Sequence, residues 1–196
     1  MDNISRYIDE YLELERKTLE AFDRDGARAV LDAMLEAHQS EGTIYVCGNG
    51  GSATTASHMA NDYNKGVSEY VEKKFRFYSL TDNAATMMSI ANDINYDEIF
   101  RFQLQGRLRP NDLVIGISGS GNSKNVVNAL SYAKEQGVKT VALCGYNGGK
   151  MKEIADVSFH VRLNNIQIVE DMQMILNHLL MNVVQRLWDI PGHNMP

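Results

Sequence analysis

Short apolar segments alternate with amphipathic helical segments along most of the chain, and this alternation restricts the fold more than any other feature of the sequence. Runs rich in β-branched and aromatic residues predict five strands, at residues 43–48, 75–80, 112–118, 139–145 and 157–162. Helical spacing predicts helices at 53–65, 84–91, 96–106, 123–136, 149–155 and 166–188. Most of the strands are continuous apolar runs, as in a sheet covered on both faces. We therefore predict an α/β fold with three layers around a doubly wound, five-stranded parallel sheet.

Two further amphipathic helices are predicted in residues 1–40, with a break near Gly26. Their apolar faces, together with that of the long closing helix, indicate helix packing between subunits. The sequence contains no internal repeat, low-complexity tract or linker-like run. We therefore predict one domain over residues 1–196, with a frayed tail at 189–196.

Charge and hydropathy exclude several classes of protein. The chain has 196 residues, with 19 Lys or Arg against 25 Asp or Glu; the net charge of −6 and the lack of a basic run argue against direct contact with nucleic acid. No segment approaches the roughly 18 apolar residues of a membrane span, and the N-terminal segment is charged where a signal peptide would be apolar. These features predict a cytoplasmic protein. Cys47 and Cys144 end apolar runs, so we expect both to be reduced and buried.

Two turns rich in glycine and serine follow predicted strands and lead directly into helices. They are Gly-Asn-Gly-Gly-Ser at residues 48–52 and Ser-Gly-Ser-Gly-Asn-Ser at residues 118–123. One such turn alone is more often a plain connection, but two in one sheet, each opening a helix whose N–H groups favour an anion, predict a phosphate site. Neither has the spacing of a nucleotide-binding motif, so no nucleotide cofactor is predicted. A third turn, at 145–149, has no group of hydroxyls and is interpreted as a connection.

These motifs resemble the sugar isomerase (SIS) family, and specifically its phosphoheptose isomerase branch. The resemblance also includes the segments 81–85 and 92–100, and it covers essentially the whole chain. It implies the flavodoxin-like SIS fold, a phosphorylated sugar as ligand, and a homotetramer with sites between subunits. The substrate-binding residues that it implies lie in both turns and in the segment 92–100: Asn49, Gly50, Gly51, Ser52, Asn92, Asp93, Ser118, Gly119, Ser120 and Ser123.

A histidine and a carboxylate follow the first turn at helical spacing. His58 and Asp62 are four residues apart and share one helix face, which suits a pair of metal ligands or an acid–base pair; the alternative is a surface hydrogen bond. The isomerases that the chain resembles carry His and Glu at these two positions. We predict Asp62, His58 and Glu170 as catalytic residues, with Asp62 or Glu170 as the base. His58 and Asp62 are also predicted as ligands of a candidate zinc ion.

The closing helix carries polar residues on two faces. Successive helical residues are about 100° apart, which places Glu170, Gln173 and Asn177 in one stripe bordered by apolar residues. Embedded polar groups usually have specific partners, so Gln173 and Asn177 are predicted to contact the substrate. The second face is interpreted as solvated; it contains Gln167, Asp171, His178, Asn182 and Gln185.

In the resembling isomerases the closing helix carries a Gln and, eight residues later, a catalytic His. Aligned on Glu170, this chain has Val169 and Asn177 at those positions, and His178 is one residue late. Bringing His178 into the site would require an inserted residue in the helix, as in a π-bulge. Of the other histidines, His160 is predicted to be a hydrogen-bonded core or edge residue, and His38 and His193 to face solvent.

The leading hypothesis is a sugar-phosphate aldose–ketose isomerase. By resemblance it is most like the enzyme that interconverts sedoheptulose 7-phosphate and glycero-manno-heptose 7-phosphate through an enediol. The alternative is a non-catalytic SIS module that binds a sugar phosphate and acts through a protein partner, similar to a regulator of replication initiation. Asp62 and Asn177, which differ from the catalytic residues of the family, favour this alternative.

Overall fold

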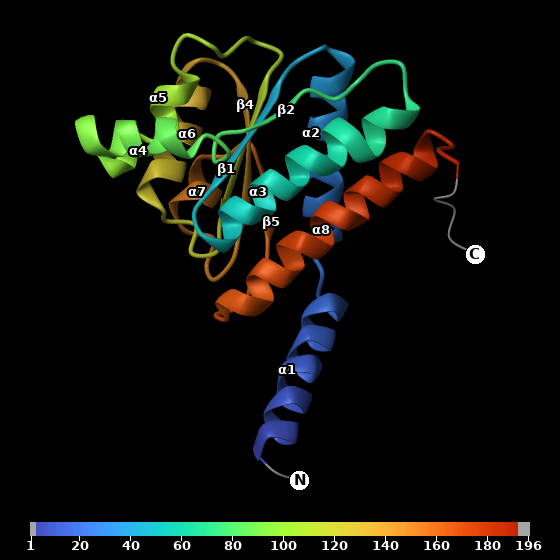
Figure 1. Ribbon diagram of the computed structural model, residues 1–196. Helices are drawn as coiled ribbons and strands as arrows, with labels where there is room; N and C mark the ends of the chain where they lie inside the picture. The colour runs from blue at the N-terminus through green and yellow to red at the C-terminus, as the bar shows by residue number, and fades with distance from the viewer. Residues whose placement is uncertain (1–2, 192–196) are drawn as a thin grey trace.

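A computed structural model describes residues 3–191 of the chain (Figure 1). The strands are β1 (Ile44–Gly48), β2 (Phe77–Ser79), β3 (Leu113–Ser118), β4 (Lys139–Cys144) and β5 (Val157–His160). They form one parallel sheet in the order β2-β1-β3-β4-β5. This is the strand order of flavodoxin-like sheets, which confirms the predicted fold class.

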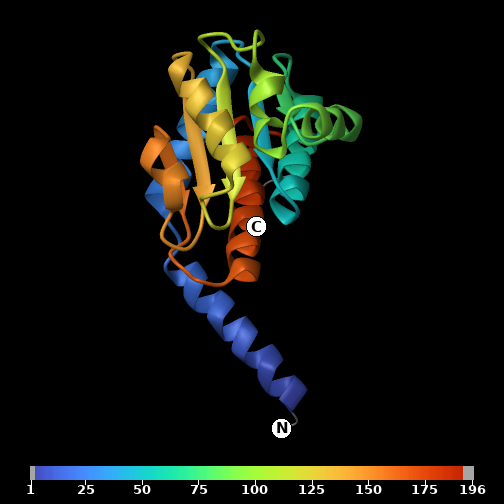
Figure 2. The same ribbon diagram turned by 90° about the vertical axis from the view of Figure 1, so that its left-hand side faces the viewer.

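Helices cover both faces of the sheet (Figure 2). One face carries α2 (Arg24–Gln39), α3 (Gly51–Asn61) and α8 (Ile166–Leu187), and the other carries α4 (Ala84–Asp93), α5 (Arg101–Leu104), α6 (Lys124–Glu135) and α7 (Gly149–Ile154). Because side chains alternate along a strand, Val46 and Ile115 pack on the face covered by α2, α3 and α8. Tyr45 and Val114 pack on the opposite face, which α4, α5, α6 and α7 cover. The sheet is therefore buried on both sides, as its continuous apolar strands predicted.

The predicted boundaries need three corrections. The segment 96–106 is not one helix: it consists of the short 3-10 helix Tyr96–Glu98 followed by α5. The predicted helix at 53–65 is α3 followed without interruption by the π-helix Asp62–Val67. The leading helices break at 21–23 rather than at Gly26, because Asp23 caps α2 by accepting a hydrogen bond from the Gly26 N–H at 2.9 Å.

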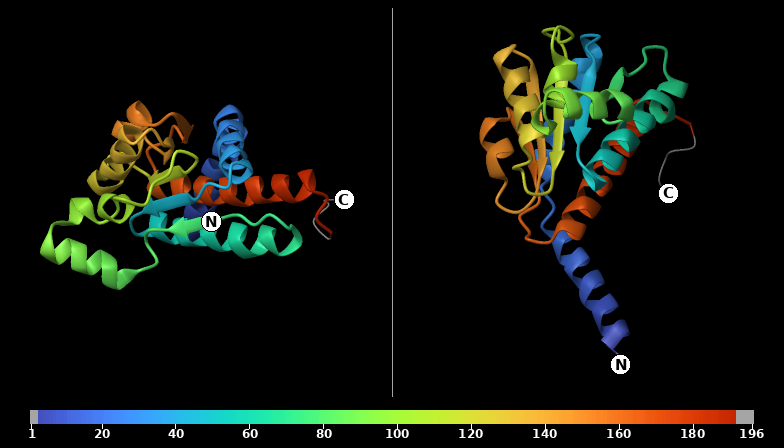
Figure 3. Two further views of the ribbon diagram at one scale, coloured as in Figure 1. Left: turned by 90° about the horizontal axis from the view of Figure 1, so that it is seen from above. Right: turned by 60° about the vertical axis from the view of Figure 1, so that its left-hand side comes forward.

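The first helix, α1 (Asn3–Glu20), extends away from the rest of the molecule, and none of its residues is buried (Figures 1 and 3). The chain ends differently from the prediction. Ile190 is 2% exposed and packs in the core, so the predicted frayed tail is wrong there, while residues 192–196 lie outside the described part of the chain. Within residues 3–191, no helix combines the length and the apolar character that crossing a bilayer requires.

Cys47 and Cys144 are free and buried, as predicted. Burial raises the pKa of the Cys47 thiol to about 12 and that of Cys144 to about 11, so neither is a thiolate near neutral pH. His38 does not face solvent: it is 9% exposed, lies 3.0 Å from the Lys73 carbonyl oxygen and packs against Phe75 and Trp188. That prediction is wrong because the aromatic partners come from segments distant in sequence. His193 lies outside the described residues.

Candidate active site

The glycine turn (residues 48–52) carries the chain from β1 into α3. Gly50 precedes the first residue of α3 with a φ of 54°, a conformation that residues other than glycine rarely adopt. The carboxylate of Glu170, from α8, lies over this turn: a Cβ atom on Gly51 would be 2.5 Å from Glu170 Oε1. Since an anionic side chain already lies at the start of α3, the start of α6 is the better position for a phosphate group.

The serine turn (residues 118–123) carries the chain from β3 into α6 and brings three hydroxyls together. Ser118 Oγ lies 3.0 Å from Ser123 Oγ and 3.5 Å from Ser120 Oγ. Ser123 occupies the N-cap position of α6, but its hydroxyl makes no capping hydrogen bond. Hydroxyls and helix N–H groups arranged in this way can bind an anion without a cationic side chain.

The third turn, 145–149, supports the serine turn as well as connecting β4 to α7. The Gly145 N–H donates to the Gly119 carbonyl oxygen at 2.9 Å. Gly121 has a φ of 67°, and a Cβ atom there would lie 2.0 Å from the Gly148 carbonyl oxygen. The two backbones therefore approach more closely than any side chain at Gly121 would permit.

The glycine turn and the serine turn leave the neighbouring strands β1 and β3, whose helices cover opposite faces of the sheet. Ligands of such folds bind at this change of direction. Here Asn49 and Asn125 exchange two side-chain hydrogen bonds of 2.9 Å, and the Tyr96 hydroxyl donates to Asn49 Oδ1 at 3.0 Å. Our sequence reasoning missed Asn125 and Tyr96. The position of Asn125 in the first turn of the helix after the serine turn was the available signal.

Asn92 and Asp93, predicted to bind substrate, lie at the exposed end of α4. Asn92 Nδ2 donates to Asp93 Oδ1 at 2.8 Å. A pocket of about 240 Å³ separates α4 from the glycine turn, and Met88 and Gly50 are among the residues that line it. In one chain these two side chains therefore contact each other rather than the two turns.

His58, Asp62 and His178 form a histidine–aspartate cluster between α3 and α8. Asp62 Oδ2 is 3.2 Å from His58 Nε2 and 3.9 Å from His178 Nε2, and the two Nε2 atoms are 3.1 Å apart. Asp62 is buried, whereas both imidazoles are exposed. The spacing of His58 and Asp62 thus corresponds to a real contact. The interpretation that His178 points away from this pair is wrong.

The packing of two helices explains this outcome. α8 runs beside α3, as different views show (Figures 1 and 3), so residues on either side of their line of contact both reach Asp62. Asn177 and His178 are such residues, although they are about 100° apart on the helix. α8 is an ordinary α-helix throughout; the π-helical turn, a feature frequent at functional sites, begins at Asp62 on the other helix.

The buried stripe of α8 lies inside the protein. Gln173 and Asn177 are both fully buried; Gln173 Nε2 donates to the Leu143 carbonyl oxygen at 3.2 Å, and Asn177 Nδ2 donates to Asp62 Oδ2 at 2.6 Å. In this geometry neither side chain has a surface for the predicted contact with substrate. Gln185, assigned to the solvated face, is 3% exposed, so that assignment is wrong.

The cluster fits a zinc ion by the chemistry and spacing of its donors. Two imidazole nitrogens and one carboxylate oxygen lie within 4.8 Å of one another. Ligands at about 2.0–2.1 Å in a tetrahedral site are about 3.3 Å apart, close to two of the three separations here. His58, Asp62 and His178 would hold the ion. His178 is the ligand that our sequence reasoning missed.

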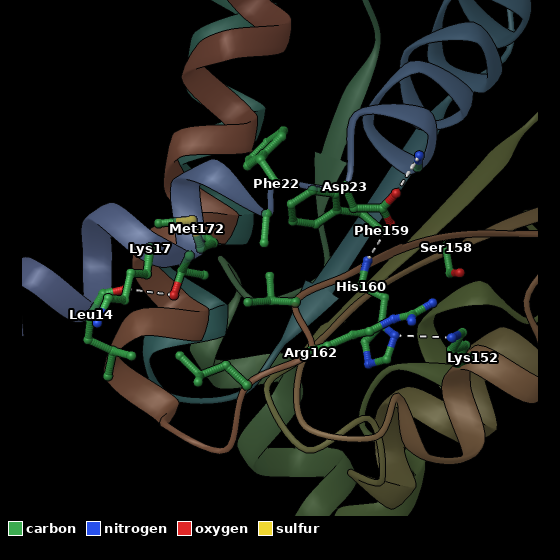
Figure 4. Close-up of a pocket in the computed structure, with 15 residues that line it drawn as sticks. Leu14, Lys17, Phe22, Asp23, Lys152, Ser158, Phe159, His160, Arg162 and Met172 are labelled. Carbon is green, nitrogen blue, oxygen red and sulfur yellow. Dashed lines mark hydrogen bonds between the residues drawn. The ribbon is translucent and has the colours of Figure 1, made fainter.

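A larger cavity, of about 680 Å³, lies between α1, α2 and β5 (Figure 4). None of the predicted site residues lines it. On its wall the His160 N–H donates to Asp23 at 3.1 Å, Lys152 Nζ lies 3.0 Å from His160 Nδ1, and His160 Nε2 lies 3.1 Å from the Tyr146 carbonyl oxygen. His160 is thus the hydrogen-bonded edge histidine that was predicted.

Known proteins resemble the chain in both sequence and fold. The SIS domain family matches residues 6–145. The phosphoheptose isomerase of Helicobacter pylori (strain Shi470) is 36% identical over 170 residues, which cover 87% of this chain and 88% of that protein. The phosphoheptose isomerase of Synechocystis is 31% identical over 186 residues, or 94% and 95% of the two chains.

A solved structure agrees with the sequence comparisons. The phosphoheptose isomerase of Neisseria gonorrhoeae superposes with a TM-score of 0.84 and 26% identity, over 94% of this chain and 98% of that one. The match extends beyond the SIS domain segment to nearly the whole described fold. The chain belongs to the phosphoheptose isomerase family of SIS-domain proteins.

Proposed function

We propose that this protein is an aldose–ketose isomerase of a seven-carbon sugar phosphate, converting sedoheptulose 7-phosphate into an aldoheptose 7-phosphate. The observation that carries the proposal is the cluster of His58, Asp62 and His178, which puts a carboxylate and two imidazoles within 4.8 Å of one another. The relatives named above, all phosphoheptose isomerases, support the choice of substrate.

The reaction moves one proton from C1 to C2 and a second between the two oxygens, by way of an enediol. Asp62 is the base for the carbon-bound proton, because only its Oδ2 contacts the histidines and Oδ1 takes no part in those contacts. Glu170, over the glycine turn, is the second carboxylate in reach of a sugar bound there, and it can give and accept the oxygen-bound proton. His178, which is exposed, would hold the metal through Nε2 and is assigned no proton, because a metal-bound nitrogen has no lone pair to accept one.

We propose zinc as the metal, held by His58, Asp62 and His178. A bound zinc ion polarises the sugar carbonyl as a Lewis acid. The serine turn would hold the phosphate through Ser118, Ser120 and Ser123. Asn49, Gly50, Gly51, Ser52, Asn92, Asp93 and Gly119 are proposed to lie along the sugar.

A homotetramer with sites between subunits is part of the proposal. α1 supports it, because an isolated helix would not keep such an apolar face in water: Ile4 is 69%, Tyr7 57% and Leu12 59% exposed. The molar mass by light scattering tests this, and a monomer at micromolar concentration would refute it. A cytoplasmic location remains a prediction from the sequence.

Proton exchange at C1 and C2 tests the function directly. The protein is incubated with sedoheptulose 7-phosphate in D2O, with added zinc and with a chelator, and deuterium incorporation and aldose formation are followed by NMR. We expect both deuterium incorporation and aldose formation when zinc is present. Saturable binding of the sugar phosphate without exchange or aldose would refute the enzyme and favour the binding module that acts through a protein partner.

A further inference from the structure

The side-chain amide of Asn177 makes the shortest polar contact with the Asp62 carboxylate. Asn177 Nδ2 donates to Asp62 Oδ2 at 2.6 Å, against 3.2 Å for the nearest imidazole nitrogen. Asn177 has no exposed surface, and Asp62 is 8% exposed. The hydrogen bond is therefore shielded from water. A hydrogen bond to a carboxylate is stronger in the protein interior than at the surface.

The hydrogen bond acts on the same oxygen that faces the histidines. Oδ2 is the Asp62 atom nearest to His58 and to His178, and it is the oxygen that Asn177 holds. An amide N–H is a donor only and neither takes up nor releases a proton near neutral pH. Asn177 can therefore fix the position of the carboxylate without competing for its protons.

The two residues of α8 that contact Asp62 are adjacent in the sequence. Asn177 precedes His178 on α8, so one rigid element supplies both the exposed imidazole and the buried amide. Asp62 sits at the first residue of the π-helix, where the backbone leaves regular α-helical geometry. The hydrogen bond from Asn177 therefore fixes the position of the Asp62 carboxylate relative to α8, the helix that also carries His178.

We propose that Asn177 is a positioning residue that fixes the Asp62 carboxylate against His58 and His178. Asn177 acts through Asp62. Its side chain is buried and therefore cannot contact the substrate directly. The kinetic consequence rests on the proposed isomerase function, whereas the consequence for metal binding does not. Partners that orient a metal ligand typically change metal affinity or activity by about 10–100-fold when removed.

Asn177→Leu, which keeps the approximate size and removes the donor, is the main test. We expect kcat for the isomerisation to fall by about 10–100-fold with KM changed by less than about twofold. The matched control is Gln185→Leu, which removes another buried amide of the same helix, 3% exposed and without contact to the cluster. Gln185→Leu should leave both constants unchanged. Equal losses in the two variants would overturn the proposal.

Zinc affinity separates a positioning role from a structural one. It is measured by competition with a chromophoric chelator for the wild type, Asn177→Leu, Asp62→Ala and the double variant. We expect Asn177→Leu to weaken zinc binding by about 10-fold or more when Asp62 is present and not when it is absent. An equal effect in both backgrounds, or none in either, would overturn the proposal.

One further measurement keeps the proposal testable if Asn177→Leu does not fold. The side-chain NH2 resonances of Asn177 in the otherwise unchanged chain should be shifted and protected from hydrogen exchange, and Asp62→Ala should remove both properties. Unprotected resonances would contradict the hydrogen bond. The two proposals can fail separately. If the effect of Asn177→Leu on zinc affinity depends on Asp62 but the protein exchanges no sugar protons, the isomerase proposal is refuted and the role of Asn177 stands. If the protein shows neither this dependence nor proton exchange, both proposals are refuted.

Discussion

The serine turn and the histidine–aspartate cluster are built in different ways. The serine turn is local: Ser118, Ser120 and Ser123 lie within six consecutive residues between one strand and one helix. The cluster is tertiary: His58 and His178 are 120 residues apart and meet only because α3 and α8 pack side by side. The serine turn can be located from a continuous sequence motif, whereas the histidine–aspartate cluster forms only through the relative placement of two helices.

This difference determines how each region tolerates change. Backbone amides and hydroxyls at a helix start bind an anion through many weak donors, so the loss of one donor is partial. In the cluster each side chain has a distinct role, and its neighbours cannot replace it. We therefore expect the largest effects of substitution in the cluster and smaller ones in the serine turn.

The largest effect is expected for His178→Leu. Loss of an imidazole that would hold the metal beside the reacting carbons should lower kcat by about 10²–10⁴-fold, with a small change in KM. Steady-state kinetics with zinc present measure it. The control is Asn182→Leu, one helical turn farther along the same polar face. If His178→Leu retains full kcat, the cluster is not the site of the chemistry, and the two regions do not differ in how they tolerate substitution.

A smaller effect is expected for Ser123→Ala. Removing one hydroxyl donor to a phosphate should raise KM by about 10-fold and leave kcat nearly unchanged, since the reacting carbons are at the other end of the sugar. Ser131→Ala, two turns into the same helix, serves as the control. A loss in kcat without a change in KM would show that the serine turn takes part in the chemistry.

Most of the fold could be predicted from the sequence because the signals were local. Five apolar runs separated by helical segments and turns led to the parallel sheet and to the position of both turns. The failures share one cause. Gln185 and His38 are polar residues whose burial depends on distant segments, and no periodicity argument on a single element can identify them.

The cluster shows the same limit more sharply. The spacing of His58 and Asp62 predicted their contact because both lie on one helix. His178 is exposed, as predicted, but it was placed away from the site because a helical wheel assumes one narrow contact face, whereas α8 contacts α3 across Asn177 and His178 together. Predicting that contact required the relative placement of two helices. Nothing in the sequence marks the π-helical turn that begins at Asp62.

The smallest effect concerns His160, whose side chain holds the turn at 145–149 that supports the serine turn. Burial lowers the pKa of His160, and Lys152 and Arg162 lower it further, while the Tyr146 carbonyl and Asp23 act in the opposite direction. As the pH falls below about 6.5, the unfolded chain takes up a proton at this residue before the folded protein does. The free energy of unfolding is therefore highest above that pH and decreases toward the lower pKa of the folded state. Urea unfolding between pH 8 and pH 5 should show a steeper decline for the wild type than for His160→Gln, with no such difference above pH 7. Identical slopes would mean that His160 contributes nothing to the pH dependence of the free energy of unfolding and would contradict the lowered pKa of this residue.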